Sequence, residues 1–227
     1  RTIMEFYRIQ RPYVTMPLTL GNSSVTVSSQ SLGNNAEEVK RLTILFTGML
    51  DVWFNIEAVE FLIRNLSNIQ KIIDSFGLDD FKIVIAGKTS GQITKITENL
   101  PSIELIPNPS KEEMSVLFGK SNIFVSPVFF STGMKTKVLE SLYHGLPVVA
   151  SETSLIGFEE DLKDVFGKYV FPFTDRDSTS FSKALQDAIS AVSKEGINSL
   201  RKNIINLYNE KYSLERFEKL IMDVCRM

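Results

Sequence analysis

Two lysines lie where a helix is expected to begin, and their charge suggests an anion-binding site. The stretch STGMKTKVLE at residues 131–140 reads as a turn followed by the first turns of a helix, with Lys135 and Lys137 at its start and no acid before Glu140. A helix N-terminus already carries about half a positive charge, so a lysine there costs roughly 0.3–1 kcal/mol. A bound anion would reverse that cost, because exposed backbone N–H groups, an accessible glycine and two cations suit a diphosphate.

A purely structural interpretation of the same charges is equally open. Lys137 could pair with Glu140 one turn later, for about 0.2–0.5 kcal/mol, while both lysines stay solvated. Residues 135 and 137 do not share a helix face, so we expect only one lysine to reach a ligand directly. Glu140 could accept two ribose hydroxyls, as acidic residues do in dinucleotide sites, or it could be a surface glutamate.

The elements that would position these residues alternate between strands and helices after residue 40. Runs that are apolar throughout predict strands buried on both faces, and helices between them predict a parallel, doubly wound α/β sheet of about six strands. The expected strands are RLTILFTG, FKIVIAG, IELIP, NIFVSPV, LPVVAS and KYVFPF.

The helices are predicted from apolar spacing and end signals. One stripe of apolar residues from Ile56 to Phe76 predicts a single long helix that stops at Gly77. Ser110 with Glu113 is a capping box, and Ser213 is an expected N-cap. The remaining expected helices cover 89–99, a segment ending near Gly145, and C-terminal ranges 178–192, 196–209 and 213–225.

The first 40 residues differ from the rest of the chain. They contain a stretch rich in Ser, Asn and Gly and at most one short strand near 25–27, so we expect a leader or linker, or the remnant of an N-terminal domain. Residues 41–227 are expected to form one nucleotide-binding domain.

A ligand of such a sheet binds at the carboxyl ends of the strands, where the strand order reverses. If the order is 3-2-1-4-5-6, the crevice lies between the first and fourth strands. The loop after the first contains Gly48, and the loop after the fourth contains Gly133. Both glycines stand where backbone must approach a ligand closely.

Composition excludes several classes of protein. The net charge of −2 gives no overall field for nucleic acid. The single cysteine excludes an internal disulfide and fits a reducing compartment, which predicts a cytoplasmic location. The inner membrane surface is an open alternative within that location. No transmembrane segment or signal peptide is expected. A single histidine and no acidic pair argue against a metal site, and His144 is expected to suit the dipole at its helix end.

The sequence GMKTKVLESLYHGLPVVAS, followed by IGF at 156–158, resembles the C-terminal half of GT-B glycosyltransferases of group 1. LFTGMLDVWFNIEAVEFL resembles the opening of that half and YSLERFEKLI its closing helix, so the resemblance covers roughly 41–225. It implies a Rossmann-like domain that binds a nucleoside-diphosphate sugar as substrate, with no further cofactor.

The resemblance also implies roles for individual residues. Glu140 would hold the ribose, and Lys135 or Lys137 the diphosphate. The backbone N–H groups of Gly133 and Met134, together with the loop at Gly48, would face the phosphates. Backbone near Ile106 and Pro107 would meet the nucleobase.

Two departures from the family pattern affect this assignment. Many members have arginine and lysine after the first strand, where this chain has Met49 and Phe54. Many also have a glutamate where Thr132 stands. The lysines at 135 and 137 are then the obvious phosphate cations, with Lys88 as a lesser candidate.

Other side chains near these loops have several interpretations. Trp53 and Phe54 could stack on a nucleobase, pack against another domain or be buried against their own helix. The VFF run at 128–130 could line a sugar pocket or pack in the core, and Asp51 is a weak candidate for sugar hydroxyls.

A GT-B enzyme closes two such domains around its substrates, and 40 residues cannot form the second. We therefore expect this chain to bind the donor and to need an N-terminal acceptor domain or a partner chain, with an unknown acceptor and no catalytic base named. The alternative is a non-catalytic nucleotide-binding module that acts with a partner chain. A dehydrogenase is disfavoured because no G-x-G-x-x-G follows the first strand.

Overall fold

A single six-stranded sheet organises the chain, and all of its strand pairs are parallel. The computed structural model describes residues 41–131 and 133–225. The predicted leader at 1–40, its short strand and Thr132 lie outside the described residues. The strands run in the order β3-β2-β1-β4-β5-β6, which confirms the predicted doubly wound fold and the assumed reversal between β1 and β4. Their bounds are β1 Arg41–Thr47, β2 Asp80–Gly87, β3 Ile103–Pro107, β4 Ile123–Ser126, β5 Val148–Ser151 and β6 Val170–Phe173.

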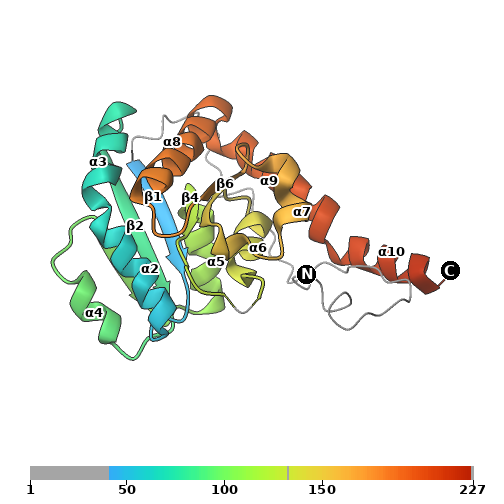
Figure 1. The fold of residues 1–227 in the computed structure, drawn as a ribbon, viewed down its shortest axis with the longest axis horizontal. Helices are drawn as coiled ribbons and strands as arrows, with labels where there is room; N and C mark the ends of the chain where they lie inside the picture. Colours follow the sequence, from blue (N-terminus) through green and yellow to red (C-terminus); the bar gives the residue numbers. More distant parts are fainter. Residues whose placement is uncertain (1–40, 132, 226–227) are drawn as a thin grey trace.

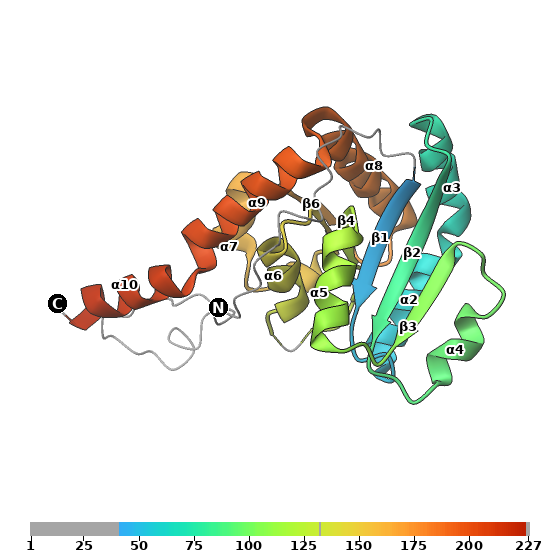
Figure 2. The same ribbon diagram turned by 180° about the vertical axis from the view of Figure 1, so that it is seen from behind.

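Helices cover both faces of the sheet (Figures 1 and 2). On one face lie α2 (Trp53–Arg64), α3 (Leu66–Ser75) and α8 (Ser178–Glu195); on the other lie α5 (Lys111–Lys120) and α6 (Thr136–Tyr143). The interior strands β4 and β5 are buried along their whole length, as continuous apolar runs predict. In the described part of the chain, no helix combines the length and the hydropathy needed to cross a bilayer.

The long helix predicted between Ile56 and Phe76 is wrong as a single element, because the chain breaks it at Asn65. Asn65 has φ −97° and ψ 3°, ends α2 and precedes α3. Its fully buried amide donates to the carbonyl of Phe61 at 2.8 Å. Asparagine competes with the helix for backbone partners, which explains a break at this residue. The apolar stripe continues across it, since Ile69 and Ile73 still face the core.

The other helices lie close to their predicted ranges. Helix α4 (Gln92–Thr97) is shorter than expected, and α5 begins with the predicted capping box at Ser110. The C-terminal helices are α8, α9 (Ile197–Tyr212) and α10 (Leu214–Cys225), with short turns η1 (Thr153–Leu155), α7 (Glu159–Leu162) and η2 (Lys163–Val165) before β6. Ser213 accepts from the backbone N–H of Arg216, as its predicted capping role requires. Helix α10 extends away from the rest of the domain (Figure 1).

Arg201 on α9 fixes the C-terminal ends of two helices on the α5–α6 face. Its guanidinium donates to the carbonyls of Phe118 and Gly119 in α5, of Ser121 just after it, and of His144 at the end of α6. A cation at two helix C-termini is favourable, because those ends carry partial negative charge. Helix α9 therefore fixes the C-terminal end of α6, the end opposite to the one near the cleft.

His144 does not act as the charged partner of the helix dipole that the sequence predicts. Its ring stacks on Phe118 with centroids 4.6 Å apart and planes 8° apart, and burial lowers its pKa to about 4. The imidazole is therefore neutral near pH 7 and packs as an aromatic ring, while Arg201 supplies the positive charge at the helix end.

Candidate functional site

A cleft of about 480 Å³ opens at the carboxyl ends of β1 and β2, beside the point where the strand order reverses. This is the edge where parallel α/β sheets bind ligands. The cleft is lined by Thr47, Gly48, Met49, Ala86, Gly87, Lys88, Asn108, Pro109, Met114 and Lys137. Gly48 and Lys137 were predicted for a ligand site, and the structure brings both to this cleft.

The floor of the cleft is a close crossing of two backbone segments. A Cβ atom on Gly87, which has φ +156°, would lie 1.8 Å from the carbonyl oxygen of Gly48. The N–H of Gly48 donates to the carbonyl of Ala86 at 3.2 Å, and the N–H of Leu50 donates to that of Lys88 at 2.8 Å. The loops after β1 and β2 therefore form one unit, and only glycine at 87 permits it.

Asn55 in the first turn of α2 secures the β1 loop from the other side. Its buried amide nitrogen donates to the carbonyl of Met49 at 2.9 Å and would lie 3.0 Å from a Cβ on Gly48. The shape of the loop at Gly48 is thus set by contacts on both sides, which gives the cleft a fixed backbone edge.

Two cations face the cleft, Lys88 after β2 and Lys137 in the first turn of α6. The Nζ of Lys137 lies 2.5 Å from a carboxylate oxygen of Glu140, so the i,i+3 pair considered in the sequence does form. Glu140 itself is not among the residues that line the cleft, and its side chain is 27% exposed. A ribose role for Glu140 stays a prediction, with its carboxylate held next to a cleft cation.

Thr47, the last residue of β1, lines the cleft and is 4% exposed. Its hydroxyl is one of two buried polar side-chain positions in the described part of the chain without a hydrogen-bond partner. A buried hydroxyl left unpaired costs about 1–3 kcal/mol. Because this hydroxyl is enclosed, the Thr47 side chain would have to turn toward the cleft to reach a ligand.

Lys135 takes a different place from the one predicted. It is the N-cap of α6, with extended backbone angles, and does not belong to the first helical turn. Its Nζ lies 4.7 Å from the centroid of the Phe54 ring, and burial lowers its pKa. The two lysines therefore point to different surroundings: Lys137 to the cleft and Lys135 to the start of α2.

The turn before α6 is held by local contacts. Ser131 and Gly133 bond to each other, the N–H of Gly133 donating to the Ser131 hydroxyl at 3.2 Å. The Met134 side chain packs against the turn at Gly157, where a Cβ would lie 2.5 Å from its Cγ. No side chain of the described residues caps the N-terminus of α6. Phosphate contacts from Gly133 and Met134 stay predictions.

The far side of the cleft lies at the end of β3. Ile106 and Pro107, the predicted nucleobase contacts, end this strand, and the cleft wall begins with the next two residues, Asn108 and Pro109. The Asn108 side chain accepts from the N–H of Thr89 at 3.0 Å and donates to its carbonyl at 3.1 Å. The β2 and β3 loops are therefore tied together at this wall.

Asp51 has a structural partner. Its carboxylate accepts from the N–H of Ser90 at 2.8 Å and the hydroxyl of Thr89 at 3.0 Å, and the Ser90 bond lowers its pKa. In the described part of the chain, no group of three or more Asp, Glu, His or Cys side chains could hold a metal ion.

Sequence reasoning did not name Thr47, Asn108, Pro109 or Met114 as cleft residues, and it gave Lys88, which lines the cleft, a lesser role than Lys135 and Lys137. The signal for Lys88 and Thr47 was available, because each directly adjoins a glycine that closes a strand at the ligand edge. Met114 comes from the first turn of α5, and only the packing of that helix brings it to the cleft.

Comparisons with known proteins agree with this arrangement. Residues 41–191, more than half of the chain, match the profile of the family Glycosyl transferases group 1. No curated protein sequence matches the chain.

Similar solved structures include three glycosyltransferases. Sucrose-phosphate synthase from Thermosynechococcus elongatus is 15% identical, with a TM-score of 0.60, over 93% of this chain and 51% of that one. A glycosyltransferase from Rickettsia africae is 12% identical, with a TM-score of 0.62, over 93% and 56%. The catalytic domain of starch synthase IV from Arabidopsis thaliana, bound to ADP and acarbose, is 15% identical, with a TM-score of 0.58, over 86% and 40%.

These structures share the fold, and this chain spans about half of their length or less. The sheet order, the cleft at the strand reversal and the profile match agree with the resemblance drawn from the GMKTKVLE motif. The chain has a GT-B type Rossmann-like domain and belongs to the group 1 glycosyl transferase family.

Proposed function

We propose that this chain supplies the donor site of a glycosyltransferase and binds a nucleoside-diphosphate sugar in the cleft at the carboxyl ends of β1 and β2. The observation that carries the proposal is that two cations, Lys88 and Lys137, line one cleft at the carboxyl edge of the sheet. The α6 N-terminus without a side-chain cap adds a partial positive charge at the same edge.

The parts of the donor are assigned to different residues in and beside this cleft. The nucleobase is placed against the β3 end, at Ile106, Pro107 and the adjoining Asn108 and Pro109. The ribose is assigned to Glu140. The diphosphate lies between the loop at Gly48 and the cations, and the bound ADP of the starch synthase structure supports a nucleoside diphosphate in this fold.

In the proposed reaction, the bond between the anomeric carbon and the diphosphate oxygen breaks, and the nucleoside diphosphate leaves with the electron pair. A new bond joins the anomeric carbon to an acceptor oxygen, whose proton passes to a base or to the leaving phosphate. Lys88, Lys137 and the α6 N-terminus stabilise the negative charge that develops on the leaving group. No group of the described chain is assigned as the base.

The acceptor site and the other wall of the active site are proposed to come from a second domain or a partner chain. The support is that this chain covers 51% and 56% of two similar structures. Family membership favours this transfer role over a non-catalytic nucleotide-binding module. We propose a cytoplasmic location, because a chain with a single cysteine fits a reducing compartment.

Isothermal titration calorimetry with UDP, GDP and ADP tests the donor site. We expect at least one nucleotide to bind, and Lys88→Ala and Lys137→Ala each to weaken it roughly 10-fold, because each change removes a charge-assisted hydrogen bond of about 1.5–3 kcal/mol. Lys71→Ala on the exposed face of α3 removes the same charge away from the cleft and should leave affinity unchanged. Failure of all three nucleotides to bind, or equal affinity in the cleft variants, would reject the proposal.

A further inference from the structure

Three aromatic side chains gather beside the cleft and form a surface that the donor-binding residues do not use. We call Trp53, Phe54 and Phe130 the aromatic platform. The ring centroids of Trp53 and Phe54 lie 5.6 Å apart, those of Trp53 and Phe130 5.1 Å apart, and those of Phe54 and Phe130 6.0 Å apart. The platform joins the start of α2 to the loop after β4, across the strand reversal.

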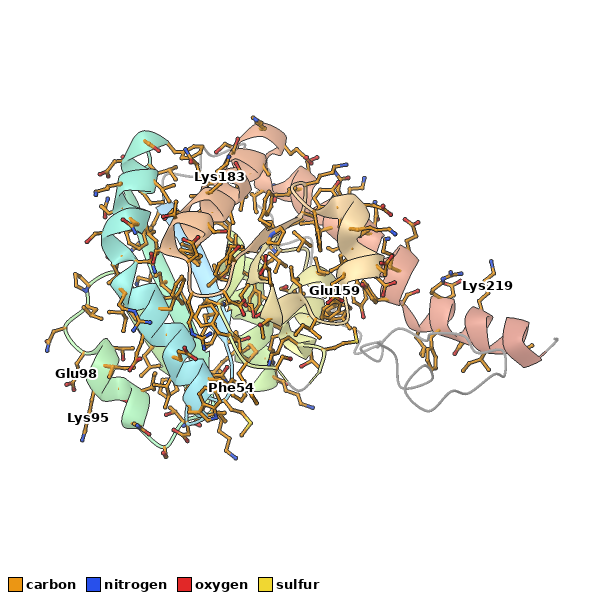
Figure 3. The ribbon with its side chains drawn as sticks, viewed as in Figure 1. Phe54, Lys95, Glu98, Glu159, Lys183 and Lys219 are labelled. Carbon is orange, nitrogen blue, oxygen red and sulfur yellow. The ribbon has the colours of Figure 1, made fainter. Side chains whose placement is uncertain are left out.

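Two of the three platform residues are open to solvent, whereas Phe54 is partly buried against the core. Trp53 is 57% exposed and Phe130 42%, whereas Phe129 is 6% exposed and packs against Phe61 in the core. Figure 3 shows Phe54 at the lower end of α2, and β1 and β2 point toward the same end in Figure 2. An aromatic group of this size is costly to leave in water unless something covers it.

Met49 lies between the cleft and the platform, because its carbonyl accepts from the N–H of Val52 at 3.1 Å and from the Asn55 amide at 2.9 Å, on either side of Trp53 and Phe54. Met49 lines the cleft, directly follows Gly48 and is 59% exposed. On its other side, the Nζ of Lys135 lies over the Phe54 ring and fixes the platform to the N-terminus of α6. A ligand whose phosphates occupy the cleft would therefore extend over Met49 onto the aromatic rings.

Polar side chains around the platform are already engaged. The Asp51 carboxylate holds the β2 loop through Ser90 and Thr89, and the Ser131 hydroxyl bonds to Gly133 in its own turn. Lys135 has no ion-pair partner in the described part of the chain, and desolvation alone lowers its pKa. Among the described residues the platform thus offers mainly carbon surface and one ammonium group. Glu57, one turn after Trp53 on α2, pairs with Arg176 through one carboxylate oxygen, and its other oxygen is buried.

We propose that the aromatic platform stacks against the sugar ring of the nucleotide sugar, and this inference rests on the donor site proposed above. In such a donor the sugar is joined directly to the diphosphate, so phosphates at Gly48 and Lys137 put the sugar at the edge that Met49 and Trp53 occupy. One face of a pyranose carries C–H groups, and these pack on the faces of Trp and Phe rings. The aromatic rings of the platform therefore contact the C–H face of the sugar.

The nucleobase is assigned to the opposite end of the cleft, at the end of β3, where Pro109 and the tied β2 and β3 loops form the wall. The aromatic platform stands across the strand reversal from that wall, since β3 is an edge strand and β4 is the neighbour of β1. A single nucleotide sugar would then span the carboxyl edge, with its base near β3 and its sugar near Phe130.

The test compares a nucleoside diphosphate with its sugar conjugate by calorimetry, using the nucleotide that binds and commercially available hexose and N-acetylhexosamine derivatives. In the wild-type chain, we expect at least one conjugate to bind more tightly than the diphosphate. Trp53→Ala and Phe130→Ala should each weaken that conjugate roughly 5- to 20-fold and leave the diphosphate unchanged, because only stacking is lost. Trp53→Phe keeps a ring at this position and should retain most of the gain.

Val116→Ala serves as the matched control, because Val116 is 51% exposed on α5 and lies outside both surfaces. Thermal denaturation of each variant tests whether the fold is retained. Equal weakening of diphosphate and conjugate would place the platform under the base or phosphates, and no change in either would assign it to a protein surface; both results overturn the inference. Absence of any nucleotide binding rejects the donor site itself and is distinguishable from these two outcomes.

Discussion

The carbonyl oxygen of Gly48 occupies the space where any side chain at position 87 would begin. A Cβ on Gly87 would lie 1.8 Å from that oxygen, and the N–H of Gly48 bonds to Ala86 next to it. The two strands that border the cleft therefore end in one interlocked crossing. The position of the backbone under the proposed diphosphate depends on this crossing.

Replacing Gly87 with alanine should separate the two loops. Because the obstacle is backbone and not a flexible side chain, we expect a loss of about 2–4 kcal/mol in the free energy of unfolding, typical of overpacking. Nucleotide affinity should fall at least roughly 10-fold in the molecules that remain folded. Urea denaturation followed by calorimetry measures both effects.

Gly119→Ala provides the comparison for that experiment. Gly119 lies within α5, and a Cβ there would have no heavy atom within 4 Å. Alanine in a helix is favoured over glycine by roughly 0.5–1 kcal/mol, so this variant should be slightly more stable and bind nucleotide normally. Similar behaviour of the two variants would show that the crossing at Gly87 is not rigid.

Among the cations of the C-terminal helices, Arg201 should contribute most to the free energy of unfolding. Arg201→Met keeps the aliphatic stem but removes the donors that serve the carbonyls at the ends of α5 and α6. Leaving several buried carbonyls unpaired should lower the free energy of unfolding by about 2–4 kcal/mol. Lys202→Met, on the exposed side of the same helix, should change it by less than about 0.5 kcal/mol. Equal stability of the two variants would contradict the capping role.

The arrangement of the sheet could be predicted because each strand is an apolar run closed by a turn residue, and burial on both faces leaves little ambiguity. The break at Asn65 could not be predicted from spacing, because the apolar stripe continues in phase on both sides of it. The Asn65 side chain ends α2 by donating to the carbonyl of Phe61. Such competition between a side chain and the helix backbone leaves no trace in the spacing of apolar residues.

The site was only partly predictable. The loops at Gly48 and Gly133 were correctly placed at one edge, because the strand order follows the commonest doubly wound pattern. Lys135 and Lys137 point in different directions because α6 begins between them, at Thr136. The residue at which a helix begins is hard to predict from a sequence to within one or two positions. The place of Lys88 in the cleft depends on the crossing of the β1 and β2 loops, which is a tertiary contact.

His144 predicts a specific loss of stability in weak acid. Its folded pKa of about 4 lies below the unfolded value of 6.5, so the unfolded chain binds the extra proton between these values and stability falls as pH falls. From pH 7 to pH 5, this residue alone should lower the free energy of unfolding by about 2 kcal/mol.

His144→Phe removes the titrating group and can keep the stack on Phe118. The difference in unfolding free energy between wild type and this variant should therefore change with pH over the 4 to 6.5 window and be constant above pH 7.5. Urea denaturation at half-unit pH steps gives this difference directly. A constant difference throughout would mean that the folded imidazole titrates normally.

Glu140 and Lys137 form one ion pair at the edge of the cleft, so a change in either disturbs the other, and nucleotide affinity alone cannot separate their roles. The ribose provides a way to separate them. If Glu140 accepts the ribose hydroxyls, wild type should bind a 2′,3′-dideoxynucleoside diphosphate roughly 10-fold or more weakly than the ribonucleotide, because hydrogen bonds to a carboxylate are worth about 1.5–3 kcal/mol. Glu140→Gln should discriminate less than wild type, because its amide makes only neutral hydrogen bonds to the ribose. Lys137→Met, which loses a phosphate contact, should weaken both nucleotides by the same factor and keep the discrimination. If Glu140→Gln discriminated as strongly as wild type, the carboxylate would serve only to hold Lys137 in the cleft, and the ribose would have to be bound elsewhere.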